Sequence, residues 1–417
     1  KAIWQCINLV NLIGDSFTSR FNFINYDYLK RLLYIHNTAI NLSEGSLNTT
    51  VLQVLSMCSA FSKAGWDVVL ATESRSECSQ SKLDTFIRSA FKEDSFVKTV
   101  FWERKLQKKF INRFFVRSKI LAIIEREIPD LIFTREPLFL RAIVKKRIPV
   151  IFESHNSKQH NRSFLLHLFI KNEIKRISFN KYFICLLTIS QNLLNFWKKQ
   201  GVPENKLFAW HDGFDSELFE NVLSKKKARK YLNLPLDKKI VIYTGGLYPD
   251  REIENILKLA EKNSEHLFII IGGPEKNRIF FENLANQNKI YNVHFRGFVQ
   301  HKNIPEYLYA GDILLALWSQ KVPTISYCSP LKLFEYMAAR RLIIVHDFPT
   351  IREVLEDGID AIFCKPGNFQ SLNSKFSEAL VKIDIDDFGI NARKKAFEMF
   401  TWNNRVKKIM EFLKFDE

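Results

Sequence analysis

Short runs of consecutive apolar residues alternate along this chain with longer stretches in which apolar positions recur every three or four residues. A short run that is apolar throughout is typical of a parallel strand covered on both faces, and the longer spacing is typical of an amphipathic helix. The alternation predicts an open parallel sheet with right-handed crossover connections. The predicted strands of the first half are Leu32–His36, Val68–Thr72, Leu131–Thr134, Val150–Glu153, Phe183–Ile189 and Leu207–Trp210.

The same alternation begins again at Lys239, after a polar segment, Asp215–Lys238, that contains the run Lys225–Lys227. We interpret this segment as the connection between two domains. The predicted fold class is α/β, with two Rossmann-like doubly wound domains facing across a cleft, because open α/β sheets bind ligands at the carboxyl ends of their strands. The predicted strands of the second half are Ile240–Thr244, Leu267–Ile271, Val293–Phe295, Ile313–Leu317, Leu342–Val345 and Ala361–Cys364.

These two series set the predicted domain boundaries. Residues 1–30 are an N-terminal extension whose purpose the sequence does not indicate, residues 31–214 form the first domain, and residues 215–238 form the connection. Residues 239–395 form the second domain, and residues 396–417 form a C-terminal helix.

Composition and charge narrow the class of partner. The chain has 417 residues with 46% hydrophobic content, which is ample for the cores of two or three domains. Its net charge of +17 favours polyanions, such as anionic lipid, nucleic acid or phosphorylated metabolites. No nucleic-acid-binding module occurs, so we expect no nucleic acid partner. The six scattered cysteines show no zinc-ligand spacing, so we expect no metal site.

Glycines and cations follow two of the predicted strands in the second half. Tyr243–Arg251 places Gly245 and Gly246 in a turn that Arg251 ends, and Ser329–Ala338 places Lys332 near the start of a predicted helix. Arginine binds phosphate oxygens as a fork and lysine as a point charge, and a helix N-terminus adds free N–H donors. The alternative is that both are ordinary surface cations beside simple strand-end turns.

Both segments resemble motifs of the family 4 glycosyltransferases, which have the GT-B fold. Tyr243–Arg251 is similar to the glycine turn of that family, and Ser329–Ala338 to its donor-binding motif. Arg296–Val299 resembles the turn beside the nucleotide base. The resemblance covers residues 31–415, and further family-like segments are Ile35–Thr38 with the Gly45 loop, Phe152–His155, Thr188–Ser190, His211–Asp215, Ile351–Leu355 with Asp357 and Gly358, and Thr401 with Trp402.

The resemblance implies a retaining, metal-independent, hexosyltransferase-like enzyme of the glycosyltransferase class. It would move a sugar from a UDP- or GDP-linked donor to a glycan or lipid-linked acceptor in cell-surface polysaccharide biosynthesis, and it would need no separate cofactor. The first domain would bind the acceptor and the second the nucleotide sugar, with the C-terminal helix crossing back to the first domain.

The resemblance also assigns roles to individual residues. Arg251 and Lys332 would stabilise the leaving diphosphate, and His155 would contact the donor sugar or the acceptor. Glu335 would accept hydrogen bonds from the ribose hydroxyls. Glu353 would touch the cleft or only begin a surface helix. The expected donor-binding residues are Gly45, Gly245, Gly246, Gly297, Phe298, Ser329, Leu333, Glu335 and Glu353.

The chain departs from the family at one position. Many members carry two glutamates separated by seven residues, and the position of the first is Tyr327 here. A subgroup with the pattern of Ser329–Met337 also lacks that glutamate. The departure bears on the identity of the donor sugar.

Basic and aromatic residues interleave between residues 101 and 119, which predicts a basic amphipathic helix that docks on an anionic membrane. Phe164–Ile170, followed by Lys171, Lys175 and Arg176, would assist. The alternative is an ordinary helix with buried phenylalanines and solvated charges. We expect a cytoplasmic protein, because scattered single cysteines suit a reducing compartment, and membrane docking would make it peripheral on the cytoplasmic face of the membrane. The interleaved residues are Phe101, Trp102, Arg104, Lys105, Lys108, Lys109, Phe110, Ile111, Arg113, Phe114, Phe115, Arg117 and Lys119.

Two other functions fit the same pattern. A GT-B-fold nucleotide-sugar epimerase would convert the donor without an acceptor. A catalytically degenerate member would act as a scaffold in a membrane glycan-assembly complex, which the missing first glutamate would allow.

Overall fold

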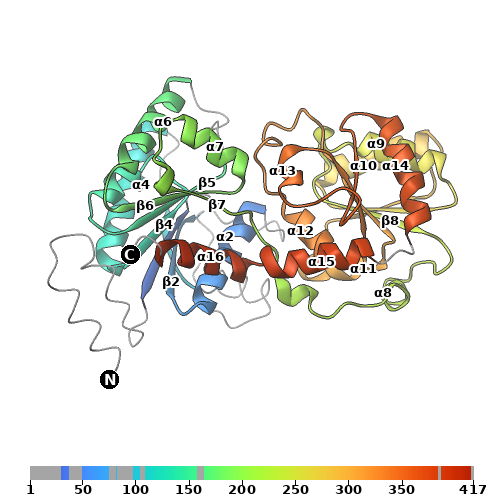
Figure 1. Cartoon of the computed structure of the whole chain (residues 1–417), viewed down its shortest axis with the longest axis horizontal. Helices are drawn as coiled ribbons and strands as arrows, with labels where there is room; N and C mark the ends of the chain where they lie inside the picture. The colour runs from blue at the N-terminus through green and yellow to red at the C-terminus, as the bar shows by residue number, and fades with distance from the viewer. Residues whose placement is uncertain are drawn as a thin grey trace.

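The computed structural model describes residues 30–36, 49–74, 81, 97–103, 109–156, 164–383 and 387–414. It contains two α/β units side by side, each built on one parallel sheet (Figure 1). The predicted extension 1–30 and the Gly45 loop lie outside the described residues, Lys30 excepted.

The first sheet has seven strands in the order β3-β2-β1-β4-β5-β6-β7, and every pair of neighbours is parallel. Its order reverses at β1, as in doubly wound folds. Its strands are β1 (Arg31–His36), β2 (Asp67–Ser74), β3 (Lys98–Glu103), β4 (Leu131–Thr134), β5 (Val150–Ser154), β6 (Phe183–Thr188) and β7 (Leu207–Ala209).

The second sheet repeats this arrangement in six parallel strands, in the order β10-β9-β8-β11-β12-β13. The prediction of two Rossmann-like units is confirmed. Its strands are β8 (Ile240–Thr244), β9 (Leu267–Ile271), β10 (Val293–Gly297), β11 (Ile313–Ala316), β12 (Leu342–His346) and β13 (Ile362–Cys364).

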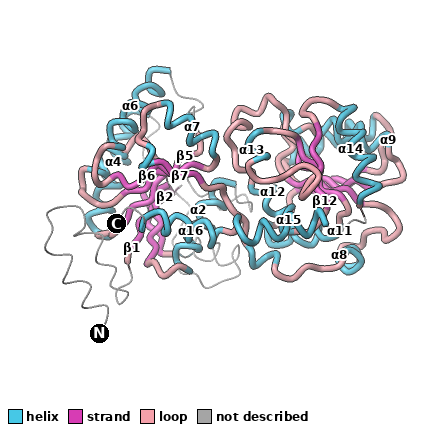
Figure 2. The backbone as a smooth tube through the Cα atoms, in the orientation of Figure 1, coloured by secondary structure: helices cyan, strands magenta, loops and turns pink. Residues whose placement is uncertain are grey.

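Helices cover both faces of each sheet, as the continuously apolar strands require. In the first unit α4–α7 pack on one face, and α2 packs with α16 on the other (Figures 1 and 2). In the second unit α8, α11, α12, α13 and α15 cover one face, and α9, α10 and α14 cover the other. The helices are α2 (Thr49–Lys63), α4 (Lys109–Glu127), α5 (Leu140–Val144), α6 (Phe164–Ser178), α7 (Gln191–Lys199), α8 (Lys225–Tyr231), α9 (Ile253–Lys262), α10 (Glu275–Gln287), α11 (Ile304–Ala310), α12 (Leu331–Ala338), α13 (Pro349–Arg352), α14 (Phe369–Lys382), α15 (Asp387–Met399) and α16 (Trp402–Lys414).

Strand β3 corrects the prediction of one basic helix between residues 101 and 119. Phe101 and Trp102 belong to β3, and α4 begins only at Lys109. Thr99 and Trp102 are buried, so this β-branched and aromatic stretch forms the edge of the sheet. Residues 104–108 lie outside the described residues, as do the side chains of residues 109–114.

The chain crosses between the two units twice. The segment interpreted as a polar connection packs Leu218, Phe219 and Leu234 into the core of the second unit. Farther along, α15 covers the second sheet, and α16 then returns to pack Val406 and Ile409 against α2 and the first sheet. Among the described helices, none combines the length and the apolar character needed to span a bilayer.

Candidate functional site

Three loops at the carboxyl ends of β8, β9 and β10 are joined by backbone hydrogen bonds. The N–H of Gly245 donates to Ile271 O at 2.9 Å, and the N–H of Gly272 donates to Gly297 O at 2.8 Å. Gly272 has a φ of +135°, and a Cβ there would lie 1.9 Å from Gly245 O, so only glycine fits. Gly272 was not among the predicted residues, because its role comes from this close approach between two loops.

Lys332 lies in the first turn of α12 and points its ammonium at two aromatic rings. Its Nζ is 4.1 Å from the ring centre of Tyr243 and 4.6 Å from that of Trp318. Its Nζ also lies 3.5 Å from the point where a Cβ on Gly245 would be. The predicted glycine turn and the predicted helix therefore meet at this ammonium. Sequence patterns did not indicate Trp318, whose contact arises only in the folded chain.

Arg251 lies close enough to Lys332 for its positive charge to affect the pKa of that lysine. Burial lowers the pKa of Lys332 well below its ordinary value, and the positive charge of Arg251 lowers it further, while Glu335 opposes the shift. Arg251 ends the short 3-10 helix Pro249–Arg251, and its Nη1 lies 3.1 Å from Asp250 Oδ1. That contact is not aligned as a hydrogen bond, and the buried Nη1 has no hydrogen-bond partner among the described residues. The structure thus brings the two predicted cations together.

Glu335 is buried on α12 and accepts a hydrogen bond from His301. Its Oε1 lies 2.7 Å from His301 Nε2. Burial lowers the pKa of His301, but the hydrogen bond and charge of Glu335 outweigh it, so the pKa is raised. His301 was not predicted, because nothing in the sequence links it to a residue 34 positions away.

Three residues around the donor motif contact the first unit. Ser329 Oγ accepts a hydrogen bond from Asp212 N at 2.8 Å, and Tyr327 O accepts one from Ser190 Oγ at 3.0 Å. Glu353 Oε2 lies 2.9 Å from His211 Nε2. Ser329 and Glu353 are expected to bind the donor, and the structure places their side chains in contacts between the units. Tyr327 packs into the core of the first unit.

The remaining predicted donor residues differ in their surroundings. The side chain of Leu333 is fully buried in the core, and its N–H donates to Pro330 O. Gly246 O accepts a hydrogen bond from the hydroxyl of Tyr243 at 3.0 Å. Gly297 has a φ of +67°, and the side chain of Phe298 beside it is 55% exposed.

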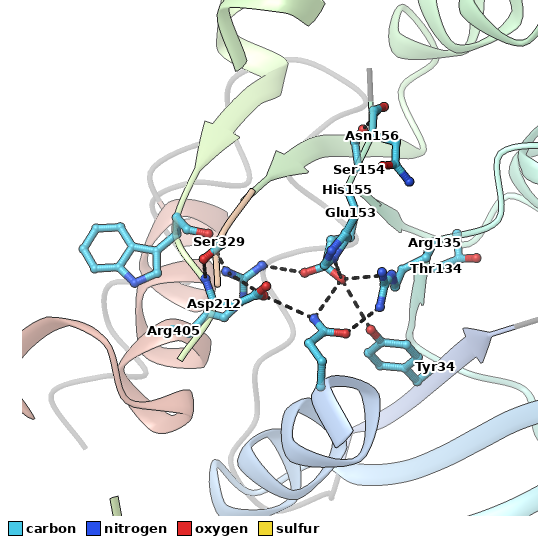
Figure 3. A network of polar contacts seen from close by, with 12 residues as sticks. Tyr34, Thr134, Arg135, Glu153, Ser154, His155, Asn156, Asp212, Ser329 and Arg405 are labelled. Carbon is cyan, nitrogen blue, oxygen red and sulfur yellow. Dashed lines mark hydrogen bonds and ion pairs between the residues drawn. The ribbon is translucent and has the colours of Figure 1, made fainter. Parts of the chain in front are cut away.

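His155 follows β5 and lies beside a buried carboxylate (Figure 3). Its Nε2 is 2.9 Å from Glu153 Oε2, and the Nη2 of Arg405 is 2.5 Å from Glu153 Oε1. Burial would raise the pKa of Glu153, but His155, Arg405 and Arg135 together lower it. Arg405 is fully buried and comes from α16, so the helix that crosses back also holds this carboxylate. No sequence pattern indicated that Arg405 is buried.

Gln53 and Asp212 extend this network toward the second unit, where Asp212 lies beside Ser329 (Figure 3). The Nε2 of Gln53 donates to Glu153 at 3.3 Å and to Asp212 at 3.4 Å. Since the N–H of Asp212 donates to Ser329, a continuous chain of contacts runs from His155 to the start of the donor motif.

The same group resembles a cation site in its donor atoms. One ligand atom each from Glu153, His155 and Asp212 lies within 4.8 Å of the others. Arg405 is 2.5 Å and 3.6 Å from the two carboxylates, and Arg135 is 3.7 Å from Glu153. Two guanidinium charges therefore already balance the two carboxylate charges. We interpret the group as a network that holds His155.

Both halves of the chain match glycosyltransferase families. Residues 224–395 match the family of glycosyl transferases group 1, and residues 51–218 match glycosyltransferase family 4. An uncharacterized glycosyltransferase of Methanocaldococcus jannaschii, MJ1607, is 22% identical over 219 residues, which cover 51% of this chain and 55% of that protein.

Two further comparisons agree with this match. The glycosyl transferase WcaI of Escherichia coli K12, whose name refers to colanic acid biosynthesis, is 24% identical over 46% of this chain and 49% of its own length. The matched stretches thus span about half the length of both relatives. The crystal structure of HepE from Anabaena with UDP and glucose superposes with a TM-score of 0.68 at 15% identity, covering 92% of this chain and all of that one.

Proposed function

The chain belongs to the family 4 glycosyltransferases with the GT-B fold, and on that premise we propose that it transfers a sugar from a UDP- or GDP-linked donor to a glycan or lipid-linked acceptor. The structure of HepE contains UDP and glucose, which supports a nucleotide-sugar donor. The name of WcaI supports a role in polysaccharide biosynthesis.

The observation that carries the proposal is the convergence of Arg251 and Lys332. The charge of Arg251 helps to lower the pKa of Lys332, and the buried Nη1 of Arg251 has no hydrogen-bond partner in the part of the chain that the structure describes. A diphosphate between them would reverse both costs, because it supplies negative charge and acceptor oxygens. Gly245 leaves no Cβ beside the ammonium of Lys332, and Gly272 allows the neighbouring loop to pack against Gly245.

The two cations would act in the chemical step by stabilising the leaving group. The bond between the anomeric carbon and the diphosphate oxygen breaks, and both electrons leave with the diphosphate. The acceptor hydroxyl attacks the face that the diphosphate leaves, and its proton passes to the departing phosphate, so the anomeric configuration is retained. Glu335 would receive the ribose hydroxyls, and His155 would orient the donor sugar or the acceptor.

Calorimetric titration of the full chain with UDP and with GDP tests the donor site. We expect one nucleotide to bind, and Arg251→Ala or Lys332→Ala to weaken binding by about tenfold or more, the effect of losing a charge-assisted hydrogen bond. Lys321→Ala is the matched control, because Lys321 is an exposed cation in the loop before α12. Folded wild-type protein that binds neither nucleotide would overturn the proposal.

Product analysis tests the reaction. We expect a panel of UDP- and GDP-sugars to give a glycosylated product only when an acceptor is present. A changed nucleotide sugar without acceptor would show an epimerase instead. Donor binding without product from any acceptor would favour a scaffold.

A further inference from the structure

A cavity of about 350 Å³ lies between α4, α5 and α6 in the first unit. This volume falls within the roughly 300–1,000 Å³ of small-molecule pockets. None of the predicted site residues lines it. The charged side chains in its wall are those of Arg117, Arg141, Lys145 and Glu173.

The cations of this cavity outnumber its carboxylate. Glu173 is shared between Arg141 and Arg176, each at 3.5 Å. Within the described part of the chain, neither Arg117 nor Lys145 forms an ion pair with a carboxylate. Arg117, Arg141 and Lys145 are exposed, so their charges reach an anion at the cavity mouth. The wall therefore complements a phosphate group.

The same cavity is bordered by apolar surface on α6. Phe169 lines it and is 54% exposed, and Leu165 and Leu168 on that helix are 76% and 38% exposed. Exposed apolar side chains grouped beside cations mark a surface that binds an amphiphilic partner. Figure 1 shows α4 and α6 together on the face of the first sheet opposite α2 and α16.

Ile170 connects this cavity to the candidate site. It lines the cavity between α4, α5 and α6, and it also lines a second cavity of about 90 Å³. The second cavity is bordered by Arg135, His155 and Trp197. One residue of α6 therefore lines both the cationic cavity and the pocket in which His155 lies.

We propose that the α4–α5–α6 cavity binds the phosphate and adjoining hydrocarbon of a lipid-phosphate-linked acceptor, whose sugar lies in the pocket beside His155. In this complex the phosphate contacts Arg117, Arg141 and Lys145, and the hydrocarbon chain of the lipid contacts Phe169. The assignment rests on the proposed transferase function, and it selects a lipid-linked acceptor over a free glycan.

Decyl phosphate below its micelle concentration is the probe, with inorganic phosphate and decyl glucoside as comparisons. Calorimetry on the full chain needs no nucleotide, so its outcome is independent of the donor titration. We expect decyl phosphate to bind more tightly than inorganic phosphate or decyl glucoside, because only decyl phosphate has both an anionic group and a hydrocarbon chain. Equal binding of inorganic phosphate, or of decyl glucoside, would overturn the proposal.

Arg141→Ser with Lys145→Ser tests the location, and both residues are exposed, so folding should not suffer. We expect this double variant to weaken decyl phosphate binding by about tenfold or more. Lys175→Ser is the control, because Lys175 is an exposed cation of α6 that lines neither cavity. Equal loss in the control, or no loss in the double variant, would contradict the site.

Sedimentation with vesicles of phosphatidylcholine and phosphatidylglycerol separates this site from a general membrane surface. The proposal would fail if the wild type bound vesicles but not decyl phosphate, and if the double variant no longer bound vesicles. The cavity would then be a surface that docks on a bilayer. Decyl phosphate binding that depends on Arg141 and Lys145 supports it whether or not vesicles bind.

Discussion

The carboxylate of Glu353 in the second unit accepts a hydrogen bond from the backbone N–H of Gln191 in the first unit, at 2.8 Å. Gln191 is the first residue of α7, where unpaired N–H groups attract negative charge. The N–H of Asn192 also donates to Glu353, at 3.3 Å. Burial raises the pKa of Glu353, but His211 and the two N–H groups outweigh it and lower the pKa. The carboxylate of Glu353 therefore binds the first turn of α7 across the boundary between the two units.

We predict that Glu353→Ala loosens this contact and increases the radius of gyration measured by small-angle X-ray scattering. Because the pKa of Glu353 is lowered, its contribution is complete above the ordinary value of 4.5 and is lost as the pH falls through the lowered pKa. Acidification should thus bring the wild type toward the variant. Glu356→Ala is the control, since Glu356 is exposed. Identical scattering from wild type and Glu353→Ala would contradict the prediction.

The buried pair of Arg405 and Glu153 predicts a large loss of stability when one partner is removed. Both side chains are fully buried, so Arg405→Met leaves an uncompensated carboxylate and should cost about 3–5 kcal/mol in the free energy of unfolding. Adding Glu153→Gln should recover part of this loss, because the stranded charge is then removed. Urea unfolding of the two variants measures both effects. If the single and double variants were equally stable, the charge of Glu153 would not be the cause of the loss, and the prediction would be wrong.

The contact between His301 and Glu335 predicts a measurable titration. The pKa of His301 is raised above 6.5, so the contact stabilises the fold fully below that pH and is lost as the pH rises through the raised pKa. In Glu335→Gln the pKa of His301 should fall, because the hydrogen bond to a carboxylate and the charge of Glu335 are lost while burial still lowers the pKa and only the charge of Asp215 still raises it. NMR titration of the imidazole checks this, with His294 as an internal reference that should not move. An unchanged His301 in the variant would contradict the assignment.

The fold was predictable because most strands are buried on both faces. Leu131–Thr134 was predicted to its exact bounds, since all four residues are apolar or β-branched and the flanks are polar. Strand β3 was missed because Lys98–Glu103 has polar ends and adjoins a run of basic residues that resembles a helix face. An edge strand covered less completely carries a weaker apolar signal.

The site was predictable only where both partners belong to motifs that the sequence shows. Lys332 and the glycine turn at Gly245 meet, as their motifs indicated. Ser329 belongs to the same motif, yet its hydroxyl faces Asp212, which lies 117 positions away. Contacts of this kind depend on how the two units are placed, and no local pattern records that. Arg405 was missed for the same reason.

The lowered pKa of Lys332 predicts that nucleotide binding takes up a proton. In the free protein burial and Arg251 keep this pKa well below 10.5, and a diphosphate favours the charged ammonium and raises the pKa. Between the lowered value and 10.5, binding of UDP or GDP should therefore draw up to about one proton from solution. Titration calorimetry in buffers of different ionisation enthalpy measures this number.

Lys332→Arg should still bind the nucleotide without the proton uptake, because a guanidinium stays charged. Lys258→Met, which removes an exposed lysine of α9, should keep it. If Lys332→Arg took up as many protons as the wild type, the proton would belong to another group, and the diphosphate would not lie against Lys332.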